Sequence, residues 1–321
     1  EKFAARAEEF LKRGNEDDAA FYYRTNVETV QELDIIAKSL GIGSYRKNGA
    51  TGILVDDSPD LRQYHETERQ LRAKHNLPHT TVLYGNDARS VANTDMNHGV
   101  VVYGDEMGVI NPMEYLEKLS GASKARIYEG TKATKIKNTR TGVVVETENG
   151  RVNARKAVVA TQGLDLNGRY RQHIEPVFGY VISTEELSPE QTESLGSWKK
   201  AAAWTLHVDP SGEIYSYFRL EDNKMIFGAQ KESISDLTDA DIQRSYGRMT
   251  GMFPILRGID IKNVWGSVIT ESEDLLPIAG WDRNTFYIDV ITAGGMVAGM
   301  TIARLMPQAL REEHHYMEMI S

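Results

Sequence analysis

The 321-residue sequence contains no cysteine, which excludes disulfide bonds, thiolate metal sites and thiol nucleophiles. No run of about 18 apolar residues occurs, so we predict no membrane-spanning helix, and no signal peptide is recognisable. Positive charge is in deficit, with 37 Lys and Arg against 46 Asp and Glu and a net charge of -9. Nucleic acids and anionic membranes require a basic face, so neither is expected as a partner. A cytoplasmic location is the default expectation.

Common catalytic patterns are also absent, since the sequence has no G-x-S-x-G, H-E-x-x-H or Walker motif. Three histidines lie in a polar stretch with two glutamates: His65, His75, His79, Glu66 and Glu68. Such a stretch is typical of a solvated helix and loop, and we predict no metal site there.

The chain lacks the usual opening of a dinucleotide-binding domain, which is a strand, G-x-G-x-x-G and a helix. The closing strand of such a domain has a counterpart in "KAVVATQG" at 156–163, an apolar run that ends in Ala160, Thr161 and Gly163. The nearest glycine pattern to an opening is "GIGSYR" at 41–46. It follows a helical segment rather than a strand, and therefore does not qualify.

Periodic apolar residues and glycine stops predict helix over most of 1–42, with an end at Gly41. "SYRKNGATGILV" predicts a hairpin that turns at Asn48-Gly49, and 60–76 is expected to be a polar helix. Asn111-Pro112 indicates the start of another helix. Short strands follow, with turns predicted at Thr141-Gly142 and Asn149-Gly150.

After residue 170 strand-like segments predominate, interrupted by helix-like stretches at 188–196 and 238–251, which indicates one mixed or antiparallel sheet. The chain then returns to an apolar strand, a glycine-rich turn, "ITAGGMVAGM", and an apolar helix. Backbone N–H groups at such a helix start can face an electron-rich ligand, although an ordinary tight turn has the same pattern. Because dinucleotide-type segments flank the strand-rich block, we predict two interleaved domains.

Taken in order, these segments resemble the family of FAD-dependent amine and amino-acid oxidoreductases. This family includes D-amino-acid oxidase, glycine oxidase, sarcosine oxidase and the γ-glutamylputrescine oxidase-like branch. "GVINPMEYLEKL" and "IYEGTKATKIKNTRTGVVVETENGRVNARKAVVATQG" are similar to its central helix start, hairpin and closing strand. "EPVFGYVISTEEL" resembles its entry strand, and "IYSYFRLEDNKMIFGAQKE" its tyrosine-bearing strand with a Gly-Ala turn. "WGSVITESEDLLPIAG" with "ITAGGMVAGM" resembles its C-terminal flavin signature.

The resemblance implies an α/β fold in which an incomplete FAD-binding, Rossmann-like domain is interleaved with a mixed-sheet substrate domain. It assigns 1–42, 105–169 and 271–321 to the first domain, and 43–104 with 170–270 to the second. FAD is the implied cofactor, and a preceding segment or a partner chain is expected to complete its site. A cysteine-linked flavin is excluded because the chain has no cysteine.

By position in the resemblance, small and apolar residues are expected beside the cofactor: Ala133, Ala160, Thr161, Gly163, Gly294, Gly295, Met296, Val297, Ala298 and Gly299. Tyr215 corresponds to the family tyrosine that leans over the substrate. Tyr217 and Arg219 share its strand face by the two-residue period, so they either line the same cavity or face solvent.

The sequence departs from the family where the substrate carboxylate binds. Amino-acid-oxidising members place an Arg four residues after the Trp of the signature, where it forms a bidentate pair with that carboxylate. The corresponding residue here is Ile269, counted from Trp265, and the flavin loop lacks the His of several members. Pro307 is expected to break or bend the last helix.

We therefore expect FAD-dependent oxidation of a C–N bond in a small amine or amino acid by hydride transfer to flavin, with substrates that lack an α-carboxylate favoured. Two alternatives stay open. One is an FAD-dependent dehydrogenase of a hydroxy acid or polyol on the same fold, and the other is a non-catalytic relative that acts as a binding or assembly subunit. A flavin absorbance band in the purified full-length protein separates an enzyme from a binding subunit.

Overall fold

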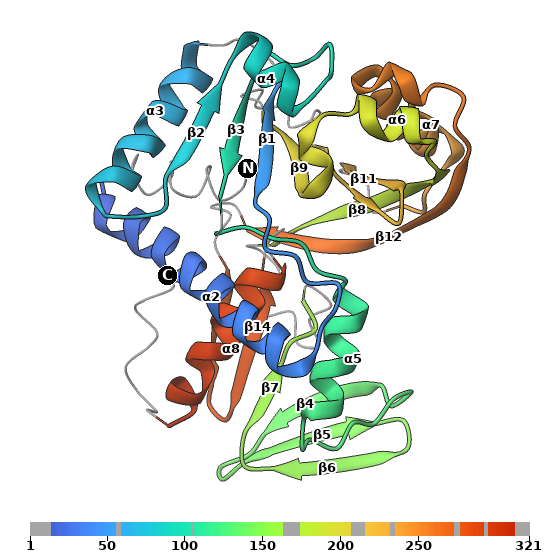
Figure 1. The fold of residues 1–321 in the computed structure, drawn as a ribbon. Helices are drawn as coiled ribbons and strands as arrows, with labels where there is room; N and C mark the ends of the chain where they lie inside the picture. Colours follow the sequence, from blue (N-terminus) through green and yellow to red (C-terminus); the bar gives the residue numbers. More distant parts are fainter. Residues whose placement is uncertain are drawn as a thin grey trace. The chain divides into compact units, whose positions relative to one another are not determined.

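The computed structural model describes residues 14–55, 59–104, 106–162, 174–206, 216–231, 235–272, 277–291 and 295–311 (Figure 1). The chain forms two compact units, Phe3–Gly121 with Phe178–Val268 and Ala122–Val177 with Ile269–Ser321. Each unit therefore combines segments that are distant in the sequence.

The first unit is organised around an eight-stranded sheet with the strand order β12-β8-β11-β10-β9-β1-β3-β2. β1 and β9 run parallel, and β1–β3, β2–β3, β9–β10, β10–β11 and β8–β11 run antiparallel, so the predicted mixed sheet is confirmed. The strands are β1 (Ala50–Leu54), β2 (Thr80–Leu83), β3 (Gly99–Tyr103), β8 (Ile174–Glu186), β9 (Ala202–Leu206), β10 (Tyr217–Glu221), β11 (Lys224–Lys231) and β12 (Ile261–Ser272).

The first long helix of this unit, α2, is delimited by a capping residue at each end. Its N-cap is Asn15, whose side chain accepts a hydrogen bond from the Asp18 N–H, and its C-cap is Gly41 at φ 63°. Glycine is favoured in this left-handed conformation, and the predicted end at Gly41 is confirmed. The helices are α2 (Glu16–Leu40), α3 (Pro59–Lys74), α4 (Gly85–Val91), α5 (Pro112–Ala122), α6 (Pro189–Ser194) and α7 (Asp239–Met252), with 3-10 turns at Ser197–Lys200 and Pro254–Leu256.

Helices pack on both faces of the eight-stranded sheet. On one face the rings of Phe218 and Phe227 stack with centroids 5.6 Å apart and belong to one cluster with Met249 of α7. On the other face Trp204 packs in a cluster with Leu61 of α3. Each fully buried large apolar side chain contributes about 1.5–3 kcal/mol, so these clusters hold the sheet between α3 and α7.

Among its described residues, the second unit contains two three-stranded sheets and the helix α8 (Gly295–Arg311). One sheet is an antiparallel meander, and its turns fall at the predicted Thr141-Gly142 and Asn149-Gly150 positions. The other has the order β13-β14-β7. The elements are β4 (Ala133–Asn138), β5 (Val143–Thr147), β6 (Gly150–Ala154), β7 (Ala157–Val159), β13 (Ile278–Asp282), β14 (Thr285–Val290) and α8 (Gly295–Arg311).

The predicted hairpin at 44–55 is wrong. Arg46 forms an isolated bridge with Val109, while β1 pairs with β3 on one side and with β9 on the other. The Asn-Gly signal does mark a turn, since Gly49 has φ 77°. Because β1 is a buried interior strand, pairing with two distant strands prevails over a local hairpin.

Two further local predictions are corrected. Gly228-Ala229 lies inside β11 rather than in a turn, because Asp222 and Asn223 supply the positive φ angles of the β10–β11 turn. Of the two effects predicted for Pro307, a break does not occur, since α8 continues to Arg311, and a bend stays a prediction. A proline removes only one backbone donor, and near the end of a 17-residue helix the remaining hydrogen bonds maintain it.

The compact units do not follow the predicted domain limits. The described parts of 1–42, and 106–121 from the segment 105–169, belong to the unit that holds the eight-stranded sheet. β7 and β14 belong to the other unit. The assignment of FAD-binding and substrate-binding roles along the chain stays a prediction.

Candidate functional site

One edge of the sheet β13-β14-β7 brings two predicted segments together. β7 and β14 run parallel, with Val158 opposite Phe286. Ala160 and Thr161 directly follow β7, and Gly295 opens α8, the helix that follows β14. Because parallel strands end at the same edge, both segments lie at the carboxyl edge of this sheet. Ligands of open α/β sheets bind at that edge.

The local sequence explains this arrangement. β14 is a central strand, and Phe286, Tyr287 and Val290 are at most 7% exposed, as expected for a strand covered on both faces. α8 begins with small and apolar residues, of which Ala298 is buried. The first turn of a helix has backbone N–H groups without intrahelical partners, and these favour an electron-rich group.

The other predicted cofactor residues lie partly in α8, partly in the other three-stranded sheet and partly outside the described residues. Met296, Val297 and Gly299 are half-buried in the first turns of α8. Ala133 is the first residue of β4 and belongs to the other three-stranded sheet. Small side chains beside a helix start fit the ring of a flavin, because backbone donors can approach it closely. Gly163 and Gly294 lie outside the described residues.

The backbone N–H groups of the glycine-containing loop at 41–46 bind a carboxylate of the protein itself. Glu114 Oε1 accepts a hydrogen bond from the Gly43 N–H at 2.8 Å, and Oε2 accepts one from the Ser44 N–H at 2.9 Å. Hydrogen bonds from Ser44 and Gly43 lower the pKa of Glu114. Because these donors already bind an anion, this loop does not supply the missing pyrophosphate site.

One face of β10 carries two of the predicted substrate residues. Tyr217 and Arg219 alternate with Phe218, which is buried on the opposite face. Burial raises the pKa of Tyr217 and lowers the pKa of Arg219. Arg219 Nη1 donates a hydrogen bond to the Ile110 carbonyl at 3.0 Å. The guanidinium is therefore tied to the backbone that precedes α5.

The remaining substrate predictions concern Tyr215 and Ile269. Tyr215 lies outside the described residues. Ile269 is half-buried on β12, four residues after Trp265, whose side chain is exposed. The sequence has no basic residue between Trp265 and Asp282, so no arginine or lysine of this segment can replace the carboxylate-binding Arg.

Sequence reasoning missed Trp204, the neighbour of Tyr217 on β9. Its Nε1 is buried and has no hydrogen-bond partner among the residues that the structure describes. The alternation in "AAAWTL" shows that Trp204 differs in face from Ala203. Only the register between β9 and β10 sets it beside Tyr217.

The prediction of a solvated helix at 60–76 is wrong for one face of this helix, which carries His65, Glu68 and Arg72 and is buried. His65 and Glu68 are 2% and 4% exposed, and Arg72 Nε donates to Glu68 Oε1 at 2.9 Å. Arg72 Nη1 also reaches Glu106 Oε1 at 3.3 Å. Desolvation opposes ionisation of Glu68, but His65 and Arg72 together lower its pKa. Paired charges allow a polar helix face to be buried.

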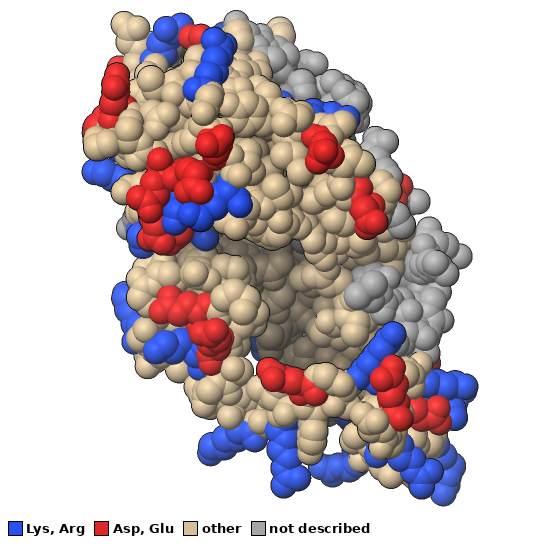
Figure 2. Space-filling model, turned by 90° about the vertical axis from the view of Figure 1, so that its right-hand side faces the viewer, with Lys and Arg blue, Asp and Glu red and all other residues tan. Residues whose placement is uncertain are grey.

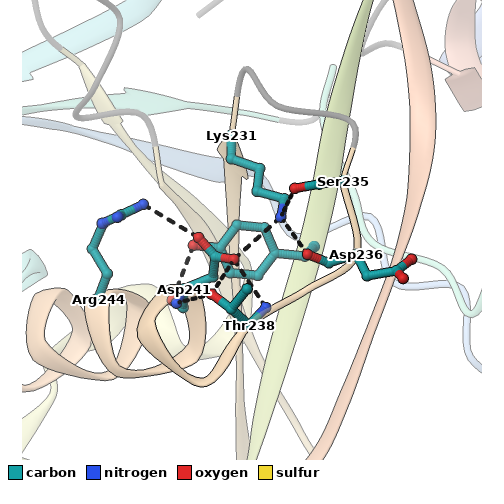
Figure 3. A network of polar contacts seen from close by, with 7 residues as sticks. Lys231, Ser235, Asp236, Thr238, Asp241 and Arg244 are labelled. Atoms are coloured by element: carbon teal, nitrogen blue, oxygen red, sulfur yellow. Dashed lines mark hydrogen bonds and ion pairs between the residues drawn. The ribbon is translucent and has the colours of Figure 1, made fainter.

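A second polar network secures the start of α7 (Figure 3). Asp241 Oδ2 accepts hydrogen bonds from the Thr238 N–H at 3.0 Å and from Lys231 Nζ at 3.2 Å. Arg244 Nη1 lies 3.4 Å from Oδ1. Hydrogen bonds from Thr238, followed by the contact with Lys231, lower the pKa of Asp241 to about 2. This network is a helix cap that joins α7 to the end of β11.

Neither the charges on the face drawn in Figure 2 nor the metal-binding groups of the described residues indicate a further site. On the face drawn in Figure 2, acidic and basic side chains are intermixed. The described residues contain no group of three or more His, Asp or Glu that could hold a metal ion. Every helix among the described residues is too short or too polar to cross a membrane.

Known proteins resemble this chain over most of its length. The family model described as DAO, FAD dependent oxidoreductase, matches residues 5–309. A curated relative, the probable oxidoreductase OrdL of Rhizobium meliloti (strain 1021), is 26% identical over 216 residues. The alignment covers 65% of this chain and 48% of the relative, so the chain spans about half the length of the curated relative it matches.

Solved structures share the fold at low sequence identity. L-proline dehydrogenase from P. horikoshii has a TM-score of 0.75 and 14% identity, covering 92% of this chain and 80% of its own. Glycine oxidase from Bacillus cereus ATCC 14579 has a TM-score of 0.73 and 17% identity, with coverages of 91% and 80%. Iminodiacetate oxidase from Chelativorans sp. BNC1 has a TM-score of 0.69 and 12% identity, with coverages of 93% and 83%. These likenesses establish a mixed α/β fold.

Proposed function

Since this chain belongs to the DAO family of FAD dependent oxidoreductases, we propose that it oxidises a C–N bond in an amine or amino acid with FAD as the hydride acceptor. The observation that supports the proposal is the parallel pairing of β7 and β14, since Ala160 and Thr161 follow the carboxyl end of β7 and α8 begins at Gly295 after the carboxyl end of β14. Neighbours described as L-proline dehydrogenase, glycine oxidase and iminodiacetate oxidase support the substrate class.

The chemistry needs positioning more than acid–base catalysis. The substrate carbon loses a hydride and its nitrogen loses a proton, so the C–N single bond becomes a C=N bond. FAD, when bound, supplies the electron acceptor. An amine that binds in its neutral form requires no strong base. A displacement of the reacting carbon by about 1 Å can reduce the rate on the order of 100-fold.

We assign the substrate-positioning role to Tyr215 and place Tyr217, Arg219 and Ile269 at the substrate site. We assign cofactor contacts to Ala133, Ala160, Thr161, Gly163, Gly294, Gly295, Met296, Val297, Ala298 and Gly299. The fit of small residues to a flavin ring supports this assignment.

We further propose that an additional segment or a partner chain completes the FAD site. β7 is an edge strand in the order β13-β14-β7, so among the described residues its other side carries no strand. Val158 on β7 is 42% exposed. Parallel sheets normally have both faces covered, so the exposed Val158 marks a face that a further segment would cover. An edge strand also leaves a row of backbone N–H and C=O groups without a partner strand, and one more parallel strand would pair with them.

The substrate screen that tests the function compares amines with small amino acids. Ile269 replaces a carboxylate-binding Arg, and losing such a pair removes about 1.5–3 kcal/mol. For the flavin-loaded protein we expect kcat/KM to be higher for primary and secondary amines than for D-alanine, glycine and sarcosine. Ile269→Arg should lower KM for D-alanine while leaving KM for amines without a carboxylate nearly unchanged. A wild-type protein that prefers D-alanine or glycine contradicts the proposed substrate class.

A further inference from the structure

The ring of Tyr217 lies against the backbone of Gly228. The two residues are direct partners across β10 and β11. A Cβ atom at position 228 would lie 2.1 Å from Cε2 and 2.2 Å from Cζ of Tyr217. Gly228 does not adopt a positive φ, so glycine is required here by space and not by backbone conformation. Any larger residue would displace the ring.

Trp204 is the partner of Tyr217 on the opposite side, across β9 and β10. Directly opposite residues in antiparallel strands share a face, with Cβ atoms about 4.5–5.5 Å apart. The Trp204 ring also packs against Tyr103, with ring centroids 5.3 Å apart. Tyr217 and Trp204 therefore form adjoining parts of one aromatic surface on this face of the sheet.

The charged residue two positions along β10 from Tyr217, Arg219, already has partners. Arg219 Nη1 binds the Ile110 carbonyl at 3.0 Å, and Nη2 lies 3.8 Å from Glu221 Oε2. Glu221 Oε2 in turn pairs with Arg46 Nη2 at 3.0 Å. The two side chains that form the aromatic surface, Tyr217 and Trp204, are uncharged, and such a surface suits an apolar chain or ring.

We propose that Gly228 is a positioning residue for the substrate, because it lets the Tyr217 ring lie against β11 and form, with Trp204, the surface on which the apolar part of an amine packs. The inference rests on the proposed function and adds the class of amine, one with a bulky carbon group. A ring that covers a strand glycine also protects the sheet backbone, and the experiment must separate these two roles.

The test compares 2-phenylethylamine with methylamine on the flavin-loaded protein. Gly228→Ala is expected to raise KM for 2-phenylethylamine on the order of tenfold, because the displaced ring loses apolar contact with the bulky carbon group of this amine. The kcat values and the KM for methylamine should change little. In a Tyr217→Leu background the Gly228→Ala substitution should add no further effect. Gly247→Ala is the matched control, since an added Cβ there meets nothing within 4 Å.

The outcomes distinguish the positioning role from packing alone. If Gly228→Ala lowers the unfolding temperature but changes neither KM, Gly228 only packs the sheet and the proposal is overturned. If that variant does not fold, Tyr217→Leu alone, which creates no crowding, must raise the KM for 2-phenylethylamine. Unchanged KM in Tyr217→Leu overturns the proposal as well.

A binding measurement separates this inference from the proposed reaction. Isothermal titration calorimetry follows 2-phenylethylamine binding without turnover. If the wild-type protein binds this amine, Gly228→Ala weakens binding and no amine is oxidised, the reaction proposal fails and the positioning role stands. A wild-type protein that oxidises amines but shows no binding preference for 2-phenylethylamine over methylamine contradicts the inference alone. A protein that neither oxidises nor binds either amine contradicts both.

Discussion

A single carboxylate, Asp241, joins the start of α7 to β11 through Thr238 and Lys231. Asp241→Asn removes the negative charge from this network, and we expect the free energy of unfolding at pH 7 to fall by about 1–3 kcal/mol. Asp236→Asn is the matched control, because Asp236 is exposed and supplies only its backbone carbonyl to Lys231. Urea unfolding of the three proteins measures the difference. Equal losses in both variants would contradict the role of Asp241.

The pH dependence of the same contact follows from its pKa. The folded-state pKa of Asp241 is lowered from 3.8 to about 2. A carboxyl group with a lowered pKa contributes stability that is fully present above its unfolded-state pKa and is lost as the pH falls through its folded-state pKa. The stability difference between the wild type and Asp241→Asn should therefore shrink between pH 4 and pH 2. A difference that stays constant over this range would contradict the assignment.

Burial, rather than sequence position, separates two glutamates of α3. The side chains of Glu68 and Arg72 are 3% and 4% exposed, whereas those of Glu66 and Arg69 are 42% and 52% exposed. Glu68→Gln leaves the buried Arg72 without its closest counter-charge, and breaking such a pair costs about 3–5 kcal/mol. Glu66→Gln should change stability little. Thermal unfolding of both variants checks the contrast, and similar shifts would refute it.

At the scale of elements, one asparagine joins the two small sheets of the second unit. Asn138 Oδ1 accepts hydrogen bonds from the Asn284 N–H at 3.2 Å and from Thr285 Oγ1 at 3.0 Å. Asn138→Ala should loosen β4–β5 from the β13–β14 turn, because two donors lose their acceptor. Hydrogen exchange should rise on both sides of this contact. Asn153→Ala, at an exposed position on β6, is the control that should leave exchange unchanged.

At the scale of the whole molecule, retention of FAD depends on a pyrophosphate-binding motif that this sequence lacks. The 321 residues contain no strand–G-x-G-x-x-G–helix unit, and the loop at 41–46 binds Glu114 instead. Residues 1–321 alone should therefore hold FAD weakly or not at all. Flavin absorbance relative to protein absorbance after gel filtration measures this. Stoichiometric retention would contradict the expectation while leaving family membership intact.

Several elements are predictable because their signals are local. Asn111 Oδ1 accepts a hydrogen bond from the Met113 N–H at 2.9 Å, as expected for the cap in Asn-Pro at the start of α5. Gly41 ends α2, and the strand, glycine-rich turn and helix near the C-terminus form β14 and α8. Each of these depends on residues within one or two helical turns. The order of such segments was also sufficient to indicate the FAD-dependent family.

The sequence by itself thus determined the end of α2 at Gly41, the start of α5 at Asn111-Pro112, the turns of the β4–β6 meander and the family. Only the tertiary structure decided that Glu68 is buried, that Glu114 occupies the loop at 41–46, and that Trp204 and Gly228 flank Tyr217. The physical reason is the same in each case. These contacts depend on strand register and on packing between residues far apart in the chain, and the periodicity of a single segment contains neither.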